Sequence, residues 1–376
     1  MDGSAHSRGE PCGDGGTALG TGAGSGRPHA AVGITDVARR AGVSASTVSR
    51  ALRDAGNVSA ATRDRVRRAA AELAYVPSPA ASRLASGRTG AVGVVVPFTT
   101  RWFFAEVIAG VEGALREDAV DLLLYNLGDR ALRGDFFQLL PMRRRVDAVL
   151  AIASSLSGVE LTRLAAVGVP VVTIGRRYAG LPGVGVDDEA GAATAVRHLL
   201  LLGHREVMMI SGSPDDPLGR TTTGARTAGF RRALAEAGIE CGADRVVAEP
   251  WGIEGGSRAA ERILSRADLP SAIFAESDEM AFGALCALRR AGLDVPGDVS
   301  LVGFDDHEVS GAYDLTTVAQ PVRDQGEQGA RLLLRLLADR AGADRGADGV
   351  PEIVLPTRLV VRGTTGPPRR PGPPGR

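Results

Sequence analysis

The chain contains no lysine, so each of its 44 basic side chains is an arginine. This absence excludes a phosphate-binding loop that needs a lysine, a lysine Schiff base and a lysine general base, and with them many classes of enzyme. Cys12, Cys241 and Cys286 lie far apart in the sequence and form no Cys-x-x-Cys pair. Neither a disulfide framework nor a cysteine zinc site is therefore expected.

The five histidines have no spacing typical of metal ligands, and no nucleophile elbow or catalytic pair of carboxylates stands out. The adjacent Asp187 and Asp188, and the adjacent Asp305 and Asp306, are interpreted as solvated loop residues whose side chains diverge. The sequence thus predicts no metal site, no cofactor, no catalytic residue and no enzyme activity.

Long apolar segments are also missing. The longest, residues 91–98 and 167–174, fall far short of the ~18 to 20 residues that a membrane-spanning helix needs. The N-terminus has no cationic start followed by an apolar stretch, which argues against a secretion signal. We therefore expect a cytoplasmic protein without a membrane partner.

The formal net charge of zero conceals an uneven distribution. Residues 33–88 carry ten arginines and four acidic residues, an excess of six positive charges, and the rest of the chain carries the matching negative excess. A basic block near one end of an acidic body is typical of a module that binds a polyanion. Nucleic acid is the leading candidate for that partner.

The length of 376 residues and the hydrophobic content of 44% indicate two or three folded units with substantial cores. Residues 1–32, rich in Gly, Ser and Thr, are expected to form a disordered leader. Residues 366–376, dominated by Pro and Gly, are expected to form a disordered tail. The folded units should lie between these two ends.

Residues 34–74 show the spacing of three short helices. Thr35, Ser44 and Ser59 are each placed to cap the start of one helix, and the helices should end near positions 41, 52 and 74. The apolar residues at helical spacing predict a compact core made of Val37, Ala38, Val48, Val66, Ala69, Ala70 and Leu73.

Residues 36–52 predict a helix-turn-helix within this region. The small Ala38 and Ala41 let two helices cross closely, and Gly42 permits the tight turn between them. Polar residues, among them Arg50, then face outward at the start of the second helix, the end that enters the DNA major groove in such motifs. The alternative, a helical hairpin without a DNA-binding role, is disfavoured by the basic block.

From Ala91 onward, short apolar strands such as 92–96 and 148–152 alternate with helical segments such as 104–117. This alternation predicts parallel sheets with helices on both faces. The length fits two lobes of that kind.

Several motifs closely resemble the lactose-repressor/galactose-repressor family of bacterial regulators. The resemblance is carried by residues 36–52, 58–66, 73–78, 93–97, 103–106, 203–205, 278–283 and 292–306, together with His198, Leu199, Arg226, Gly229 and Phe230. It covers residues 33–365. It implies an N-terminal all-α helix-turn-helix head followed by an α/β body of two lobes, similar to a periplasmic binding protein and built on two doubly wound parallel sheets.

The resemblance implies that residues 33–77 form the DNA-binding domain and residues 78–88 a hinge helix. In this interpretation Leu84 is an apolar wedge that enters the minor groove and kinks the duplex; its alternative is a side chain that only packs in a linker. The DNA-binding residues implied are Thr35, Ser44, Ala45, Ser46, Thr47, Ser49, Arg50, Asn57, Arg83 and Leu84.

For the body, residues 89–365, the resemblance implies that an effector is held between the lobes. The N-lobe is expected to comprise about 89–190 and 318–348, and the C-lobe about 191–317 and 349–365. The effector-binding residues implied are Phe104, Arg220, Thr222, Arg226, Trp251, Asp278 and Asp305.

A guanidinium and a carboxylate, such as those of Arg226 and Asp305, together suit vicinal hydroxyls, and the Trp251 ring suits the apolar face of a sugar. Each of these residues also has an ordinary structural interpretation as core or surface. One departure from the family pattern is Gly175 followed by Arg176, where many members carry an aspartate, so effector identity does not transfer.

These observations predict a homodimeric regulator, a repressor, that binds a pseudo-palindromic operator under the control of a small-molecule effector, a sugar or sugar derivative. Two other kinds of protein share part of this pattern. A solute-binding protein of a transporter needs a signal peptide and has no helix-turn-helix. An enzyme built on two Rossmann-like lobes needs a catalytic constellation, and the sequence contains none that we recognise.

Overall fold

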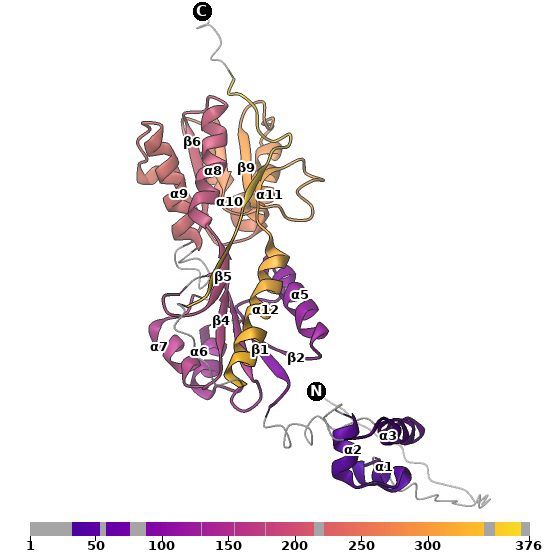
Figure 1. Cartoon of the computed structure of the whole chain (residues 1–376). Coiled ribbons are helices and arrows are strands. Elements are labelled where there is room, and N and C mark those ends of the chain that lie inside the picture. The colour runs from indigo at the N-terminus through magenta and orange to yellow at the C-terminus, as the bar shows by residue number, and fades with distance from the viewer. Residues whose placement is uncertain are drawn as a thin grey trace, which may run out of the picture. The chain divides into compact units, whose positions relative to one another are not determined.

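The computed structural model describes residues 32–52, 58–75, 88–128, 130–153, 155–176, 178–213, 222–341 and 350–369 (Figure 1). The chain divides into two compact units, with the boundary between Ser82 and Arg83. Four expectations fall outside the described residues: the disordered leader apart from Val32, the hinge helix apart from Arg88, the DNA-binding roles of Asn57, Arg83 and Leu84, and the effector-binding role of Arg220.

The first unit contains the helices α1 (Ile34–Ala41), α2 (Ala45–Leu52) and α3 (Ala60–Glu72). The two serine caps are confirmed, because Ser44 Oγ accepts from Thr47 N at 3.2 Å and Ser59 Oγ accepts from Thr62 N at 3.3 Å. The expectation that Thr35 caps α1 is wrong.

Helix α1 begins at Ile34, two residues earlier than a cap at Thr35 requires. Gly33 is its N-cap. The Asp36 carboxylate accepts from Gly33 N at 3.0 Å, and this bond from side chain to backbone stabilises the first turn. Gly42 ends α1 with a φ of 65°, a left-handed conformation that glycine adopts without strain. Val37, Val48 and Val66 are fully buried where the three helices meet, so the expected core is confirmed.

The second unit consists of two lobes, each built on a six-stranded sheet. The first lobe has the strand order β11-β5-β4-β3-β1-β2, and every pairing in it is parallel. Its elements are β1 (Ala91–Val96), α5 (Trp102–Glu117), β2 (Asp121–Asn126), α6 (Arg130–Leu139), β3 (Ala148–Ile152), α7 (Gly158–Ala165), β4 (Val171–Ile174), β5 (Gly183–Val186), α12 (Val322–Ala341) and β11 (Glu352–Leu355).

The second lobe has the order β12-β10-β9-β8-β6-β7, with only the edge strand β12 antiparallel among the described strands. Its elements are α8 (Asp188–Leu201), β6 (Val207–Gly212), α9 (Thr222–Glu236), the 3-10 turn η1 (Ala243–Arg245), β7 (Val246–Glu249), α10 (Ile253–Leu264), β8 (Ala272–Ala275), α11 (Asp278–Arg290), β9 (Ser300–Asp305), β10 (Thr316–Ala319) and β12 (Arg358–Val360).

Helices cover both faces of each sheet (Figure 1). In the first lobe, α5 and α12 share one apolar core with the sheet, and α6 and α7 cover the other face. In the second lobe, α8 and α9 cover one face and α10 and α11 the other. The central strands are buried along their whole length, as in other sheets covered on both sides. The predicted fold class is confirmed.

Three expected boundaries within this unit are wrong. Strand β11 pairs with β5, so residues 352–355 complete the first sheet, although residues 349–365 were expected in the C-lobe. Strand β10, which includes residues 318 and 319, pairs with β9 and belongs to the second sheet. Residues 366–369 are not a free tail: the Gly366 carbonyl lies 2.8 Å from His204 Nε2, and Gly366 N donates to Ser300 Oγ at 3.0 Å.

Helices α10 and α11 cross at reciprocal glycines. A Cβ on Gly283 of α11 would collide with the backbone carbonyl of Ile253, and a Cβ on Gly256 of α10 would collide with that of Met280. Each glycine therefore lets the other helix approach to backbone contact.

We expect Gly283→Ala to lower the free energy of unfolding by about 1 to 3 kcal/mol, because the added methyl must push the two helices apart. Thermal unfolding measures this change. Gly113→Ala is the matched control: Gly113 lies inside α5 with open space around its Cβ position, so alanine there should stabilise by about 0.5 to 1 kcal/mol. Equal effects of the two substitutions would contradict the close crossing.

Candidate functional site

A pocket of about 80 Å³ lies between the lobes of the second unit. It is formed by residues that follow the carboxyl ends of parallel strands, the usual place for a ligand in open α/β sheets. Its lining is Arg101, Trp102, Phe103, Phe104, Ala153, Gly175, Val186, Asp188, Thr222, Arg226, Trp251, Ser277, Glu279, Asp305 and Gln320.

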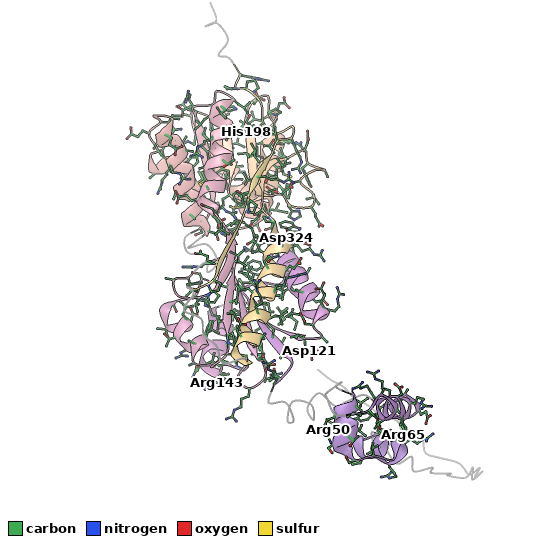
Figure 2. All side chains as sticks on the ribbon, in the orientation of Figure 1. Arg50, Arg65, Asp121, Arg143, His198 and Asp324 are labelled. Atoms are coloured by element: carbon green, nitrogen blue, oxygen red, sulfur yellow. The ribbon has the colours of Figure 1, made fainter. Side chains whose placement is uncertain are left out.

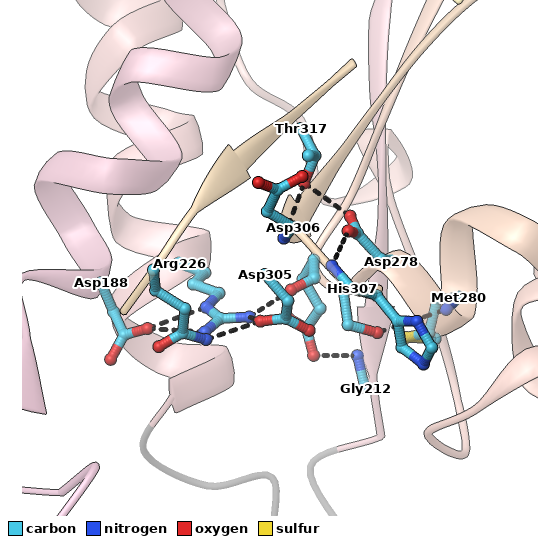
Figure 3. A network of polar contacts seen from close by, with 12 residues as sticks. Asp188, Gly212, Arg226, Asp278, Met280, Asp305, Asp306, His307 and Thr317 are labelled. Carbon is cyan, nitrogen blue, oxygen red and sulfur yellow. Dashed lines mark hydrogen bonds and ion pairs between the residues drawn. The ribbon is translucent and has the colours of Figure 1, made fainter. Parts of the chain in front are cut away.

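Arg226, on α9, is the central charged group of the pocket and is only 3% exposed (Figure 3). Its Nε and Nη2 atoms lie 2.9 and 2.8 Å from Asp188 Oδ1, and Nη1 lies 3.7 Å from Asp305 Oδ1. Nη1 also donates to the carbonyl of Glu276. The guanidinium is thus fixed in place and has its charge balanced before any ligand binds.

Asp305 ends strand β9 with a φ of 126°, and Asp306 follows at 58°. Such values are strained for residues other than glycine, and strain of this kind is found mostly at functional sites. Asp305 Oδ1 accepts from Gln320 Nε2 at 2.6 Å, while Asp306 turns away to Arg362 Nη2 at 2.7 Å. The two side chains therefore diverge as expected, but Asp305 is a buried pocket residue and not a solvated one.

Glu276 is a second buried carboxylate, at the end of β8 and close behind the pocket. It accepts from Gly212 N at 2.5 Å, Thr223 Oγ1 at 2.9 Å and Ser211 Oγ at 3.1 Å. Burial raises the pKa of Glu276 from 4.5 to about 7, against the opposing effect of these hydrogen bonds and of Arg226. Burial likewise raises the pKa of Asp305.

Glu276→Gln should remove part of the pH dependence of stability. Because the pKa of Glu276 is higher in the folded chain, the contribution of this group to stability is largest below about pH 4.5 and is lost as the pH rises through about 7. We expect equal stability of variant and wild type near pH 5, and an advantage of the variant at pH 8 of up to about 3 kcal/mol. Urea unfolding at the two pH values measures this, and a constant difference between them would contradict it.

Asp278 is not among the residues that line the pocket, although its neighbours Ser277 and Glu279 are, and its expected contact with the effector stays a prediction. Its oxygens accept from Thr317 Oγ1 and Ser310 Oγ, both at 2.6 Å, and from His307 N at 2.8 Å. With these three hydrogen bonds, the carboxylate connects the loop that follows β9 to strand β10. Its role in this structure is to position the backbone around Asp305.

The two tryptophans of the chain both line the pocket, Trp102 from α5 and Trp251 from the loop after β7. Trp102 stacks on His307 of the other lobe with ring centroids 4.7 Å apart. Trp251 lies against the backbone of Gly212, where a Cβ would collide with its indole nitrogen. The Nε1 atoms of both are buried and have no hydrogen-bond partner among the described residues. A bound molecule with acceptor atoms would satisfy these donors.

The pocket brings together five of the seven residues expected to bind the effector: Phe104, Thr222, Arg226, Trp251 and Asp305. The sequence interpretation missed Asp188, Gln320 and Trp102. Asp188 was assigned to a solvated loop, yet it starts α8 and pairs with Arg226. Gly175 also lines the pocket, whereas the neighbouring Arg176 turns to Ser155 Oγ at 3.0 Å and to the Tyr178 ring.

In the first unit, most of the described residues expected to contact DNA lie on α2 or directly before it, from Ser44 to Arg50 in its last turn. Ser44, Ser46 and Arg50 are exposed, while Ala45, Thr47 and Ser49 are half-buried. Ser44 Oγ lies 2.8 Å from Ser46 Oγ, and Arg50 Nε donates to the Ser46 carbonyl at 3.3 Å. Thr35 is exposed at the start of α1.

Two further findings concern the described part of the chain. It contains no group of three or more His, Cys, Asp or Glu side chains that could hold a metal ion. None of its helices combines the length and the apolar character that a membrane crossing requires.

Comparison with known protein families gives two matches. Residues 33–78 match the family of bacterial regulatory proteins named lacI, and residues 196–365 match a periplasmic binding protein-like domain. The transcriptional regulator DegA of Bacillus subtilis is 33% identical over 344 residues, which are 89% of this chain and 98% of DegA.

Solved structures agree with these matches. The lac repressor dimer bound to operator and the anti-inducer ONPF superposes with a TM-score of 0.77 at 28% identity, covering 89% of this chain and 99% of that one. The complex of the transcriptional regulator CelR with cellobiose superposes with a TM-score of 0.65 at 32% identity, covering 90% and 100%. These relatives are transcriptional regulators rather than enzymes.

Proposed function

Because the chain belongs to the lacI family of bacterial regulatory proteins, we propose that it is a cytoplasmic repressor that binds operator DNA through residues 33–77 and releases it when a neutral sugar occupies the pocket between the lobes. The sugar assignment rests on one observation: the same pocket is lined by two tryptophans and by an arginine whose charge is already balanced by carboxylates.

The pocket suits a ligand that both donates and accepts hydrogen bonds. The unpartnered indole nitrogens of Trp102 and Trp251 need acceptors, and the carboxylates of Glu279 and Asp305, which also line the pocket, can accept from donors. A hydroxyl group supplies both functions, and the indole rings suit the apolar face of a sugar ring.

The charge of the pocket disfavours a phosphorylated ligand. Arg226 is already paired with Asp188 and Asp305, and Glu276 lies just behind it. An anion in the pocket would therefore meet several buried carboxylates, and only Arg101 among the lining residues would offset them.

The operator side of the proposal rests on the first unit and on symmetry. One helix-turn-helix contacts few bases, so a two-fold dimer on a pseudo-palindromic site is the arrangement that doubles the readout. The lac repressor relative is a dimer bound to operator. Sedimentation of the full chain should give a dimer at micromolar concentration; a monomer in the presence of operator DNA would rule this arrangement out.

Tryptophan fluorescence tests the ligand, because the two reporters of the chain are both in the pocket. The full chain would be titrated with ribose, glucose, cellobiose, a nucleoside and the 6-phosphate of glucose. We expect at least one neutral sugar to change the emission and to lower the affinity for operator DNA, while the sugar phosphate changes neither.

Two variants locate the signal. Trp251→Phe and Trp102→Phe should each lose part of the change in emission, whereas Tyr75→Phe in the first unit should leave it intact. A response to the sugar phosphate but not to its parent sugar would refute the neutral ligand. An undiminished response in both tryptophan variants would place the ligand elsewhere.

A further inference from the structure

Three consecutive arginines, Arg143, Arg144 and Arg145, form an exposed turn between α6 and β3 in the first lobe. We call these residues the arginine turn. No hydrogen bond or ion pair of their guanidinium groups is found among the described residues. Arginines elsewhere in this unit are commonly paired, as Arg197 is with Glu236 at 2.7 Å. Three adjacent unpaired cations create a local positive potential that attracts anions.

The arginine turn is held firmly by its flanks. Met142 and Val146, on either side of it, are 0% and 3% exposed and belong to the core beneath α6. Arg143 N donates to the Leu140 carbonyl at 3.0 Å, and Arg145 N donates to the Met142 carbonyl at 2.9 Å. The backbone is therefore fixed, and all three side chains are exposed; Figure 2 shows Arg143 extending from the lobe.

This turn lies beside the point where the chain enters the second unit. Asp147, two residues after the turn, accepts from Thr89 N at 2.7 Å and from Gly90 N at 2.8 Å. Strands β1 and β3, which begin directly after these two segments, are neighbours in the sheet. The covalent connection to the first unit thus starts at the N-terminal end of these strands, the same end of the sheet that carries the arginine turn.

From this juxtaposition we propose that the arginine turn binds phosphates of the DNA that flanks the operator, so that the second unit contributes directly to DNA affinity. This inference rests on the proposed function. Residues 76–87 link the units and span at most about 45 Å when extended, so DNA held by the first unit is kept at high local concentration near the turn. Arginine suits phosphate because its planar fork donates two hydrogen bonds at once.

An exposed carboxylate at the same end of the sheet should oppose this binding. Asp121 starts β2, pairs through its backbone with Gly90, and is exposed (Figure 2). Asp121→Asn should therefore raise DNA affinity at low salt, which is the opposite sign to loss of the arginines.

The test uses the full chain and two duplexes that share an operator selected by the wild type from a random-sequence pool. One duplex is about 40 base pairs long, and the other is trimmed to about 20, enough for two half-sites one helical turn apart. Arg143→Gln/Arg144→Gln/Arg145→Gln removes the charge of the turn. The matched control, Arg205→Gln/Arg231→Gln/Arg289→Gln, removes three exposed charges from the second lobe.

On the long duplex, loss of the arginine turn should weaken binding at 50 mM salt by at least about 10-fold and reduce the slope of log K against log salt by about 1 to 3 per protomer. On the short duplex this variant and the wild type should be alike. The control should match the wild type on both. Thermal midpoints verify that each variant is folded. If the triple variant does not fold, Asp121→Asn still tests the proposal, because it should raise the affinity for the long duplex at low salt.

The outcomes separate the two proposals. A wild type that selects no sequence from the pool overturns the operator-binding function and the role of the arginine turn with it. A wild type that selects an operator, combined with an unchanged salt slope in the turn variant, overturns the role of the turn alone. An equal loss in the turn variant and in the control would assign the effect to overall charge and also overturn it.

Discussion

Arg226→Ala should lower the free energy of unfolding of the second unit by about 3 to 5 kcal/mol and abolish the response to the effector. The guanidinium lies between two carboxylates, those of Asp188 and Asp305, and its removal leaves both of them buried without a cation. Breaking a buried ion pair from one side has costs of this size because the remaining charge is neither hydrated nor paired.

Arg232→Ala is the matched control for this prediction. Arg232 lies on the same helix and also pairs with an acid, Glu189 at 2.5 Å, but both side chains are 41% exposed. An exposed pair of this kind contributes about 0 to 1 kcal/mol. Urea unfolding of both variants gives the comparison, and similar losses would show that burial of Arg226 has no special energetic role.

A second variant tests whether the pairing itself is responsible. In an Arg226→Ala background, Asp188→Asn should restore part of the lost stability, because it removes one of the unpaired charges. In the wild-type background the same Asp188→Asn should destabilise. If the two effects have the same sign, the loss in Arg226→Ala comes from packing against Phe304, whose ring centroid is 3.7 Å from the guanidinium carbon.

Arg50→Ala should weaken binding to the operator by about 1 to 3 kcal/mol for each protomer, hence about 2 to 6 kcal/mol for a dimer. Arg50 is exposed on α2, and its Nε bonds to the Ser46 carbonyl one turn earlier, which holds the side chain along the face that carries Ser46. If Arg50 contacts a base, binding to random-sequence DNA should change little.

Arg68→Ala supplies the comparison, because Arg68 is an exposed arginine on α3 in the same unit. Its loss should affect operator and random duplex equally, through charge alone. Electrophoretic mobility shift at two salt concentrations measures all four affinities. Equal losses on both duplexes for Arg50→Ala would make Arg50 a phosphate contact and would leave base recognition to other residues of α2.

The sequence predicted the first unit closely because its determinants are local. The serine caps, Gly42 and the apolar residues at helical spacing all act within a turn or two of the chain. The Thr35 cap failed because a second start lay only two residues earlier, where Gly33 N donates to the Asp36 carboxylate and Asp36 N donates to the Gly33 carbonyl.

The pocket was predicted less completely because its partners are distant in the chain. Thirty-eight positions separate Asp188 from Arg226, and no spacing rule connects them. Asp278 and Asp305 are both aspartates near the carboxyl end of a strand. The oxygens of Asp278, however, accept hydrogen bonds from Thr317 and Ser310. Only the three-dimensional arrangement decides which of the two carboxylates faces the pocket.

The crossing of the chain between the lobes has a consequence for biosynthesis. Strand β5 ends at Val186, but its neighbour β11 ends only at Leu355, about 170 residues later. At about 5 to 20 residues per second the ribosome needs roughly 10 to 30 s for that interval. Once the ribosome has synthesised Ala319, the second lobe has every strand of its sheet except β12 and can form. During this time β5 has no hydrogen-bonded neighbour on the side where β11 later pairs. A chain that ends before residue 352 would thus expose an unpaired strand edge. We expect such a chain to aggregate or to be degraded in the cell, and not to act as a shortened regulator.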